Sequence, residues 1–196
     1  MTKRLFDILF SVLGIFFLLP LYIITTVCIL LDSKGGVFFF QTRVGKNNQN
    51  FKLFKFRTMK PGSDKKGLIT VGGKDDRVTK VGYYLRKYKL DELPQLFNVL
   101  NGTMSFVGPR PEVRKYVAMY NKEQLKVLTV QPGITDYASI EYSNENAILA
   151  RSENPDEDYI NLIMPAKLKL NLKYISEMGV LTDVKLIVKT ILKIVS

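Results

Sequence analysis

A stretch of 24 residues without a single charge, from Ile8 to Leu31, constrains the fold of this 196-residue chain more than any other feature. As a straight helix it would be about 36 Å long, and the hydrocarbon core of a bilayer is roughly 30 Å thick. The length excludes a usual signal-peptide core, and no small-x-small cleavage site follows. The sequence therefore predicts an N-terminal helix that enters a membrane.

The flanks of this stretch bear on how the helix sits in the membrane. Lys3 and Arg4 precede it, and seven Lys or Arg residues follow between positions 34 and 60, where Asp32 is the only nearby acid. Positive residues hold a flank on the cytoplasmic side, and here both flanks are positive. Pro20 near the middle removes a backbone hydrogen bond and favours a kink. A bent helix that leaves by the leaflet it entered satisfies both observations, whereas an ordinary span with a tolerated proline is the alternative.

Composition limits the chemistry. The net charge of +11 predicts an anionic partner, which can be a nucleic acid, a phosphorylated substrate or an anionic lipid leaflet. The chain has no histidine, and its only cysteine, Cys28, lies in the apolar stretch. Histidine bases, histidine metal ligands and Cys–His nucleophile pairs are therefore excluded, and a catalytic group would be a carboxylate. The length suits one domain.

Two strands of a β-hairpin are expected at 37–40 and 51–59, on either side of a turn-rich segment. The second strand alternates aromatic with basic residues, from Phe51 to Arg57. This pattern can stack on bases and neutralise phosphates, or it can be a half-buried strand whose cations face lipid headgroups. A polar, glycine-rich loop at 60–76 is expected to be mobile and near a site.

Helical spacing predicts most of the remaining chain. One short helix carries Val78, Val81 and Leu85, and the next has Pro94 in its first turn, which puts Asp91 near its N-cap. A helix is also expected over 112–127. The segment 167–173 fits a strand or a helix. The segment capped by Asp183 reads as a helix with a wide apolar face and a lysine edge, suited either to the membrane interface or to packing on the core.

The adjacent carboxylates Asp91 and Glu92 are the candidate catalytic pair. The field of a helix N-terminus, worth roughly 0.3–1 kcal/mol, would keep Asp91 ionised. An ionised carboxylate can attack phosphorus, and two of them can hold Mg²⁺ beside a phosphate. Arg57, Arg86 and Arg110 can supply the positive charge that phosphoryl transfer needs. The alternative is that Asp91 and Glu92 only cap a helix.

Five motifs together resemble one family, the bacterial sugar transferases, which are small monotopic phosphoglycosyl transferases. They run in order over nearly the whole chain, and the Asp-Glu pair followed by Gly-Pro-Arg-Pro is the most specific part. The motifs are Lys3-Arg4-Leu5-Phe6-Asp7, Phe54-Lys55-Phe56-Arg57-Thr58-Met59, Leu90 to Leu100, Met104 to Pro111 and Pro132-Gly133-Ile134-Thr135.

The resemblance implies transfer of a phospho-sugar from a UDP-sugar to polyprenol phosphate. In this reaction Asp91 would attack the sugar-bearing phosphate, expel UMP and form an aspartyl-phosphosugar. Glu92 would act as acid/base and, with Asp91, as ligand of an Mg²⁺ cofactor. Arg57, Arg86 and Arg110 would bind phosphates. The product would be the first membrane intermediate of a glycoconjugate such as O-antigen, capsule or a glycoprotein glycan.

The resemblance also implies an architecture and a location. The expected fold is α+β and mostly helical, with a re-entrant membrane helix at 1–31. A catalytic domain at 32–196 would lie on the cytoplasmic face of the bacterial inner membrane, with a β-hairpin and amphipathic interfacial helices around the active site. The expected partners are the donor, the acceptor and membrane lipids, without nucleic acid. The oligomeric state stays open, and a homodimer is compatible with such an enzyme.

Three positions depart from the family pattern. Leu19 precedes Pro20 where many members have serine, and Asn171 stands where members often have aspartate. The segment after Thr135 reads Asp136-Tyr137-Ala138-Ser139-Ile140 instead of the Gly-Trp-Ala-Gln form frequent in the family, which leaves the identity of the sugar open. The alternative function is a membrane-tethered module that binds anionic lipid or nucleic acid without catalysis.

Overall fold

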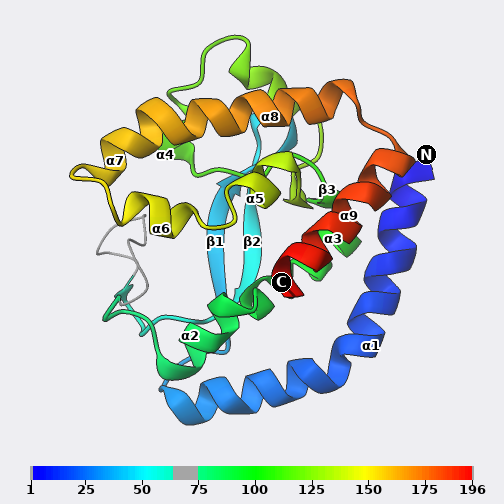
Figure 1. Ribbon diagram of the computed structural model, residues 1–196. Helices are drawn as coiled ribbons and strands as arrows, with labels where there is room; N and C mark the ends of the chain where they lie inside the picture. The colour runs from blue at the N-terminus through cyan, green and yellow to red at the C-terminus, as the bar shows by residue number, and fades with distance from the viewer. Residues whose placement is uncertain (1, 64–74, 196) are drawn as a thin grey trace.

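A computed structural model describes residues 2–63 and 75–195 (Figure 1). The protein is a mostly helical α+β structure, as expected from the sequence, and it contains two small sheets. The described helices are α1 Thr2–Asp32, α2 Lys80–Lys87, α3 Gln95–Asn101, α4 Arg114–Val117, α5 Tyr137–Glu141, α6 Glu145–Leu149, α7 Pro155–Asp158, α8 Met164–Ser176 and α9 Val180–Val195. A π-helical turn, Tyr159–Ile163, joins α7 to α8, and three 3₁₀ turns are η1 Lys46–Asn48, η3 Leu90–Glu92 and η4 Gln124–Thr129.

Helix α1 is drawn as two arms that meet in a bend, and its one internal proline is Pro20 (Figure 1). Proline lacks the N–H that an unbroken helix needs, and its ring collides with the preceding turn. Within the part of the chain that the structure describes, α1 is the one helix long and apolar enough to cross a membrane. Most of its apolar side chains are exposed, with Phe16, Phe17 and Leu31 among the most accessible.

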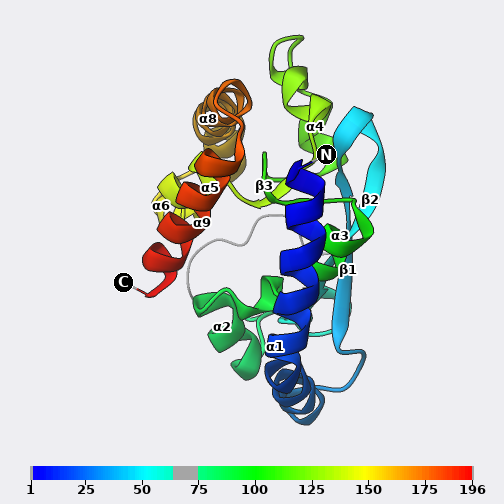
Figure 2. The same ribbon diagram turned by 90° about the vertical axis from the view of Figure 1, so that its right-hand side faces the viewer.

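Both ends of α1 are bonded to the rest of the protein. At the first end, the Arg4 guanidinium donates to the carbonyl oxygens of Val99 and Leu100 at the end of α3, at 2.6 and 2.8 Å. At the second end, the Asp32 carboxylate accepts a hydrogen bond of 2.9 Å from the Val81 N–H at the start of α2. Between them, the Tyr22 hydroxyl donates to the Leu93 carbonyl at 2.7 Å. The two arms therefore lie against one body (Figure 2).

The predicted hairpin is confirmed as β1 Phe38–Val44 paired antiparallel with β2 Asn50–Phe56. Its turn contains Asn47 and Asn48 at φ of 54° and 61°, a conformation that asparagine tolerates well. Alternation divides β2 into two faces. Phe56 packs with Tyr22 of α1, whereas Leu53 packs on the other face against Val99 and Met104.

A second sheet was not predicted. The strands β3 Ser105–Val107 and β4 Gly133–Thr135 pair in parallel, and three residues are too few to show a periodic pattern. Gly108 and Gly133 allow the close approach, because a Cβ on Gly133 would lie 2.1 Å from the Gly108 nitrogen. A Cβ on Gly108 would lie 2.4 Å from the Gln131 carbonyl oxygen. A side chain on either glycine would therefore push the backbone at Gly108, where the loop after β3 begins, away from the backbone before β4.

Several helix predictions need correction. The helix expected over 112–127 is wrong, because α4 ends early and the Asn121 side chain accepts hydrogen bonds from the N–H groups of Glu123 and Gln124, a turn that competes with helix. The ambiguous segment 167–173 is helical, within α8. Asp183 lies in the first turn of α9 but bonds Lys3 and Tyr174 instead of capping the helix. Of the loop expected at 60–76, residues 64–74 lie outside the described residues.

Candidate active site

Asp91 and Glu92 lie in the 3₁₀ turn η3, between α2 and α3. Lys89 precedes the turn at φ 57°, a left-handed conformation that reverses the chain after α2. Helix α3 begins at Gln95 with Pro94 at its N-cap position, and no side chain caps it. The prediction that Pro94 occupies the first turn is therefore wrong by one position. The capping interpretation of the carboxylate pair is also wrong, which leaves both carboxylates for other partners.

Glu92 is bound by two cations. The Lys55 ammonium lies 2.9 Å from Oε1, and the Arg110 guanidinium donates to Oε2 at 3.1 Å and to Oε1. Burial by itself would raise the pKa of Glu92, but the charges of Arg110 and Lys55 outweigh it and hold that pKa well below its usual range. Glu92 is therefore a fixed negative charge that aligns the Arg110 fork.

Asp91 is in a different electrostatic state. Its side chain is buried, and burial raises the pKa of the Asp91 carboxyl, while the charges of Lys55, Arg86 and Lys89 act against this rise. The expectation that a helix field keeps Asp91 ionised meets an opposing effect, because desolvation has the largest influence on this pKa and raises it. Among the described residues, no group donates a hydrogen bond to the Asp91 carboxylate. Within the described residues the Asp91 carboxylate thus accepts no hydrogen bond, and the charges of three cations and of the neighbouring Glu92 act on its pKa in opposite directions.

The three predicted arginines are placed differently. Arg110 contacts Glu92, as described above. Arg86 lies on α2, where its Nε donates to the Thr58 hydroxyl at 2.9 Å and its charge acts on Asp91. Arg57 donates from its two terminal nitrogens to the carbonyls of Ser33 and Lys34, just after α1. The structure thus brings Arg86 and Arg110 to the carboxylate pair and directs Arg57 to the end of α1, and the phosphate-binding roles of all three stay predictions.

Lys55 is the site residue that sequence reasoning missed. The signal was present in the alternation of β2, because Lys55 is two residues from buried Leu53 and therefore on the same face. That face packs toward α3 and η3, where Glu92 lies. The alternation of aromatic and basic residues instead predicted that Lys55 would face lipid headgroups or phosphates.

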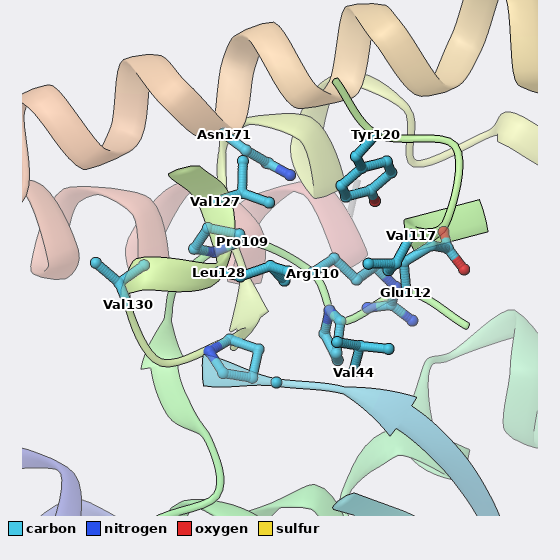
Figure 3. A pocket seen from close by; sticks show the side chains of 13 residues that line it. Val44, Pro109, Arg110, Glu112, Val117, Tyr120, Val127, Leu128, Val130 and Asn171 are labelled. Carbon is cyan, nitrogen blue, oxygen red and sulfur yellow. The ribbon is translucent and has the colours of Figure 1, made fainter. Parts of the chain in front are cut away.

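Asn171 lines a small cleft beside Arg110. The cleft is formed by Arg110, Glu112, Tyr120 and Asn171 together with apolar residues of the loops at 109–111 and 127–132 (Figure 3). Asn171 is buried on α8, and its Oδ1 has no hydrogen-bond partner in the described structure. Asn171, which stands where family members often have aspartate, therefore lies next to the candidate site. An asparagine at this position cannot act as a base.

Comparison with known proteins identifies the family. The sequence profile described as bacterial sugar transferase matches residues 1–196. The chain is 38% identical over 192 residues to the UDP-N-acetylgalactosamine-undecaprenyl-phosphate N-acetylgalactosaminephosphotransferase of Aeromonas hydrophila, which covers 96% of this chain and 42% of that protein. It is 35% identical over 202 residues to the UDP-glucose:undecaprenyl-phosphate glucose-1-phosphate transferase of Escherichia coli K12, covering 98% of this chain and 40% of that protein.

A third relative is of similar size. An uncharacterized sugar transferase of Bacillus subtilis is 34% identical over 192 residues, which cover 98% of this chain and 86% of that protein. The chain spans less than half the length of the Aeromonas and Escherichia relatives. With a family match along its whole length, this chain belongs to the bacterial sugar transferases.

Proposed function

We propose that this protein transfers a phospho-sugar from a UDP-sugar to polyprenol phosphate as the first membrane step of glycoconjugate assembly. The observation that carries the proposal is the buried Asp91 carboxylate, which accepts no hydrogen bond from the described residues and lies near the charges of Lys55, Arg86 and Lys89 as well as that of Glu92. The names of the Aeromonas and Escherichia relatives, which specify undecaprenyl phosphate as acceptor, support the same reaction class.

In the first step an Asp91 carboxylate oxygen attacks the phosphorus that carries the sugar. A bond forms between this oxygen and phosphorus, and the bond from phosphorus to the oxygen of UMP breaks, so that UMP leaves with both bonding electrons. Burial favours this attack, because a carboxylate stripped of water is a stronger nucleophile. Arg110 and Arg86 would stabilise the charge on the phosphoryl oxygens.

In the second step an oxygen of polyprenol phosphate attacks the same phosphorus. The Asp91–phosphorus bond breaks, the carboxylate is restored, and the product is a polyprenyl-diphosphate-linked sugar. Phosphate monoesters are largely ionised at neutral pH, so the acceptor needs little help from a base. The electrostatics therefore favour Glu92 as the charge that orients Arg110 and Lys55, whereas its lowered pKa does not support the acid/base role implied by resemblance.

The acidic pair fits Mg²⁺ when the substrate provides further ligands. Mg²⁺ is commonly held by one or two carboxylates, with substrate phosphates and waters in the other positions. Asp91 accepts no hydrogen bond from the described residues, whereas both oxygens of Glu92 already accept hydrogen bonds from Arg110 and Lys55. Asp91 would thus be the principal protein ligand of Mg²⁺. Glu92 would bind the ion only if Lys55 or Arg110 gave up its contact with the Glu92 carboxylate. The ion would neutralise charge on the substrate phosphates.

The protein surface supports a monotopic, re-entrant anchor. Both arms of α1 are bonded to one body, so the helix need not carry its two flanks to opposite sides of a bilayer. Helix α9 packs on that body through Leu186 and exposes Leu181 and Leu192, with Lys185, Lys189 and Lys193 beside them. An apolar surface with a lysine edge suits a helix in the membrane interface.

Re-entrance predicts that both flanks of α1 face the cytoplasm. Cysteines introduced as Thr2→Cys and Lys60→Cys, each in a Cys28→Ser background, should both resist an impermeant maleimide in intact cells. Both should be labelled once the inner membrane is permeabilised. If one of the two positions reacts from outside, α1 is an ordinary span and the chemistry is unaffected.

Release of UMP without acceptor tests the proposed reaction. Purified enzyme is mixed with Mg²⁺ and a UDP-sugar that it turns over in the complete reaction, but without polyprenol phosphate. It should release about one UMP per active site and then stop, because the covalent intermediate accumulates. Addition of polyprenol phosphate should restart turnover. If UMP appears only when acceptor is present, for every donor that turns over, the covalent route is wrong.

The alternative is a membrane-tethered module that binds anionic lipid or nucleic acid. The net charge of +11 supports it, but the hairpin cation Lys55 is bonded to Glu92 and the Arg57 guanidinium to backbone carbonyls. A binding module would show polyanion affinity that falls steeply with salt and is indifferent to Asp91→Asn.

A further inference from the structure

The first turns of α1 occupy the free edge of strand β3. Strand β3 pairs with β4 along one edge, so the N–H and C=O groups of its other edge need partners. The Asp7 carboxylate accepts hydrogen bonds from the Phe106 N–H at 3.2 Å and from the Ser105 hydroxyl at 3.1 Å. The Lys3 ammonium donates to the Val107 carbonyl at 3.0 Å. Because Lys3 and Asp7 are four residues apart and therefore lie on one helix face, their side chains together satisfy an N–H and a C=O group of β3.

A second set of contacts holds Lys3 in place. Its ammonium also bonds the Asp183 carboxylate of α9 and lies 3.2 Å from the Tyr174 hydroxyl of α8. This hydroxyl is 2.7 Å from Asp183 Oδ1 and 3.1 Å from the Val107 carbonyl oxygen. Tyr174 and Asp183 are buried, and α1, α8 and α9 therefore meet at the last residue of β3.

The segment held in this way leads directly to the active site. Val107 is followed by Gly108, Pro109 and Arg110. On the β4 side the Gly108 N–H donates to the Thr135 carbonyl, and the Gly133 N–H donates to the Pro109 carbonyl, both at 3.0 Å. The loop that carries Arg110 is thus bonded to β4 on one side and begins at a residue bonded to α1 on the other.

We propose that Lys3 and Asp7 are positioning residues, which couple the docking of the membrane helix to the placement of the Arg110 guanidinium against Glu92. In this role α1 does more than anchor the protein, because two side chains of its first turns bond the strand from which the Arg110 loop extends. The expected loss of rate rests on the proposed function, because it requires that Arg110 takes part in the reaction. The expected effect on the structure of the Arg110 loop does not.

The test combines hydrogen exchange with turnover, on protein in lipid nanodiscs. Lys3→Met and Asp7→Ala should each speed amide exchange in the peptide 105–111, and each should lower the initial rate of UMP release about tenfold or more, since small misplacements of a substrate-binding group are costly. Lys3→Arg and Asp7→Asn keep a donor and an acceptor for β3, and should keep slow exchange and most of the rate.

Arg4 provides the matched control. It is a neighbouring cation on α1 that bonds the end of α3 rather than β3. Arg4→Met should therefore speed exchange near 99–102 and leave both peptide 105–111 and the rate nearly unchanged. Unchanged exchange at 105–111 in Lys3→Met and Asp7→Ala would overturn the proposal, as would an equal loss of rate in Arg4→Met. Failure of the proposed function looks different, because wild-type protein would then release no UMP while the exchange pattern stayed as described.

Discussion

Asp91→Asn should abolish UMP release from UDP-sugars, with a loss of at least about 10⁴-fold, as expected when a nucleophile is removed. The amide has nearly the same shape but no charge, and it is a poor nucleophile toward phosphorus. UMP release measured with and without polyprenol phosphate should fall together, because both steps pass through the same atom.

The same substitution should not destabilise the protein. Burial raises the pKa of Asp91, which means that the surroundings disfavour its charge, and no described group donates a hydrogen bond to it. The melting temperature of Asp91→Asn should therefore equal or exceed that of the wild type. Asp156→Asn, on α7 where the carboxylate accepts from the Tyr116 hydroxyl, is the control that should keep UMP release. An active Asp91→Asn protein would refute the nucleophile assignment.

Arg110→Met should lower the rate of UMP release by about 10²–10³-fold. The substitution removes a forked donor from the phosphoryl group, and such donors are commonly worth this much in the transition state. It also leaves buried Glu92 with Lys55 as its remaining described ion-pair partner, so the pKa of Glu92 should rise. Arg110→Lys should be intermediate, because an ammonium keeps the charge but cannot make two parallel hydrogen bonds.

Arg43 is the matched control for Arg110. It is also a half-buried arginine bonded to a glutamate, Glu112, and its guanidinium donates to the Pro111 carbonyl in the same loop region. Arg43→Met should lower the melting temperature while reducing the rate much less than Arg110→Met does. Equal rate losses in the two variants would show that Arg110 acts through the stability of the loop and not through phosphate.

Local sequence patterns predicted the N-terminal helix and the hairpin. The uncharged stretch with Pro20 predicted a bent apolar helix, and the segments 37–40 and 51–59 predicted a hairpin, because periodicity and turn residues act over a few positions. The parallel pair of β3 and β4 depends on Gly108 and Gly133, which come together only in the folded chain. No local pattern reveals such a contact. The missed break at Asn121 reflects a side-chain turn that outweighs helical spacing.

The sequence pointed to most residues of the candidate site, but it missed Lys55 and the electrostatics of the carboxylate pair. Motif resemblance selected Glu92 and Arg110, which the structure brings into contact. The raised pKa of Asp91 and the lowered pKa of Glu92 depend on burial and on Lys55, which comes from another strand. Two adjacent carboxylates look equivalent in a sequence. In the fold Glu92 is bound by two cations, whereas Asp91 accepts no hydrogen bond from the described residues.

The most direct measurement is the location of the covalent intermediate. Protein incubated with a UDP-sugar in the absence of acceptor would be quenched, digested and mapped by mass spectrometry. The account predicts a mass increase of one phospho-sugar on the peptide that contains Asp91, which disappears when polyprenol phosphate is added before the quench. A phospho-sugar on any other residue, with Asp91 unmodified, would contradict it.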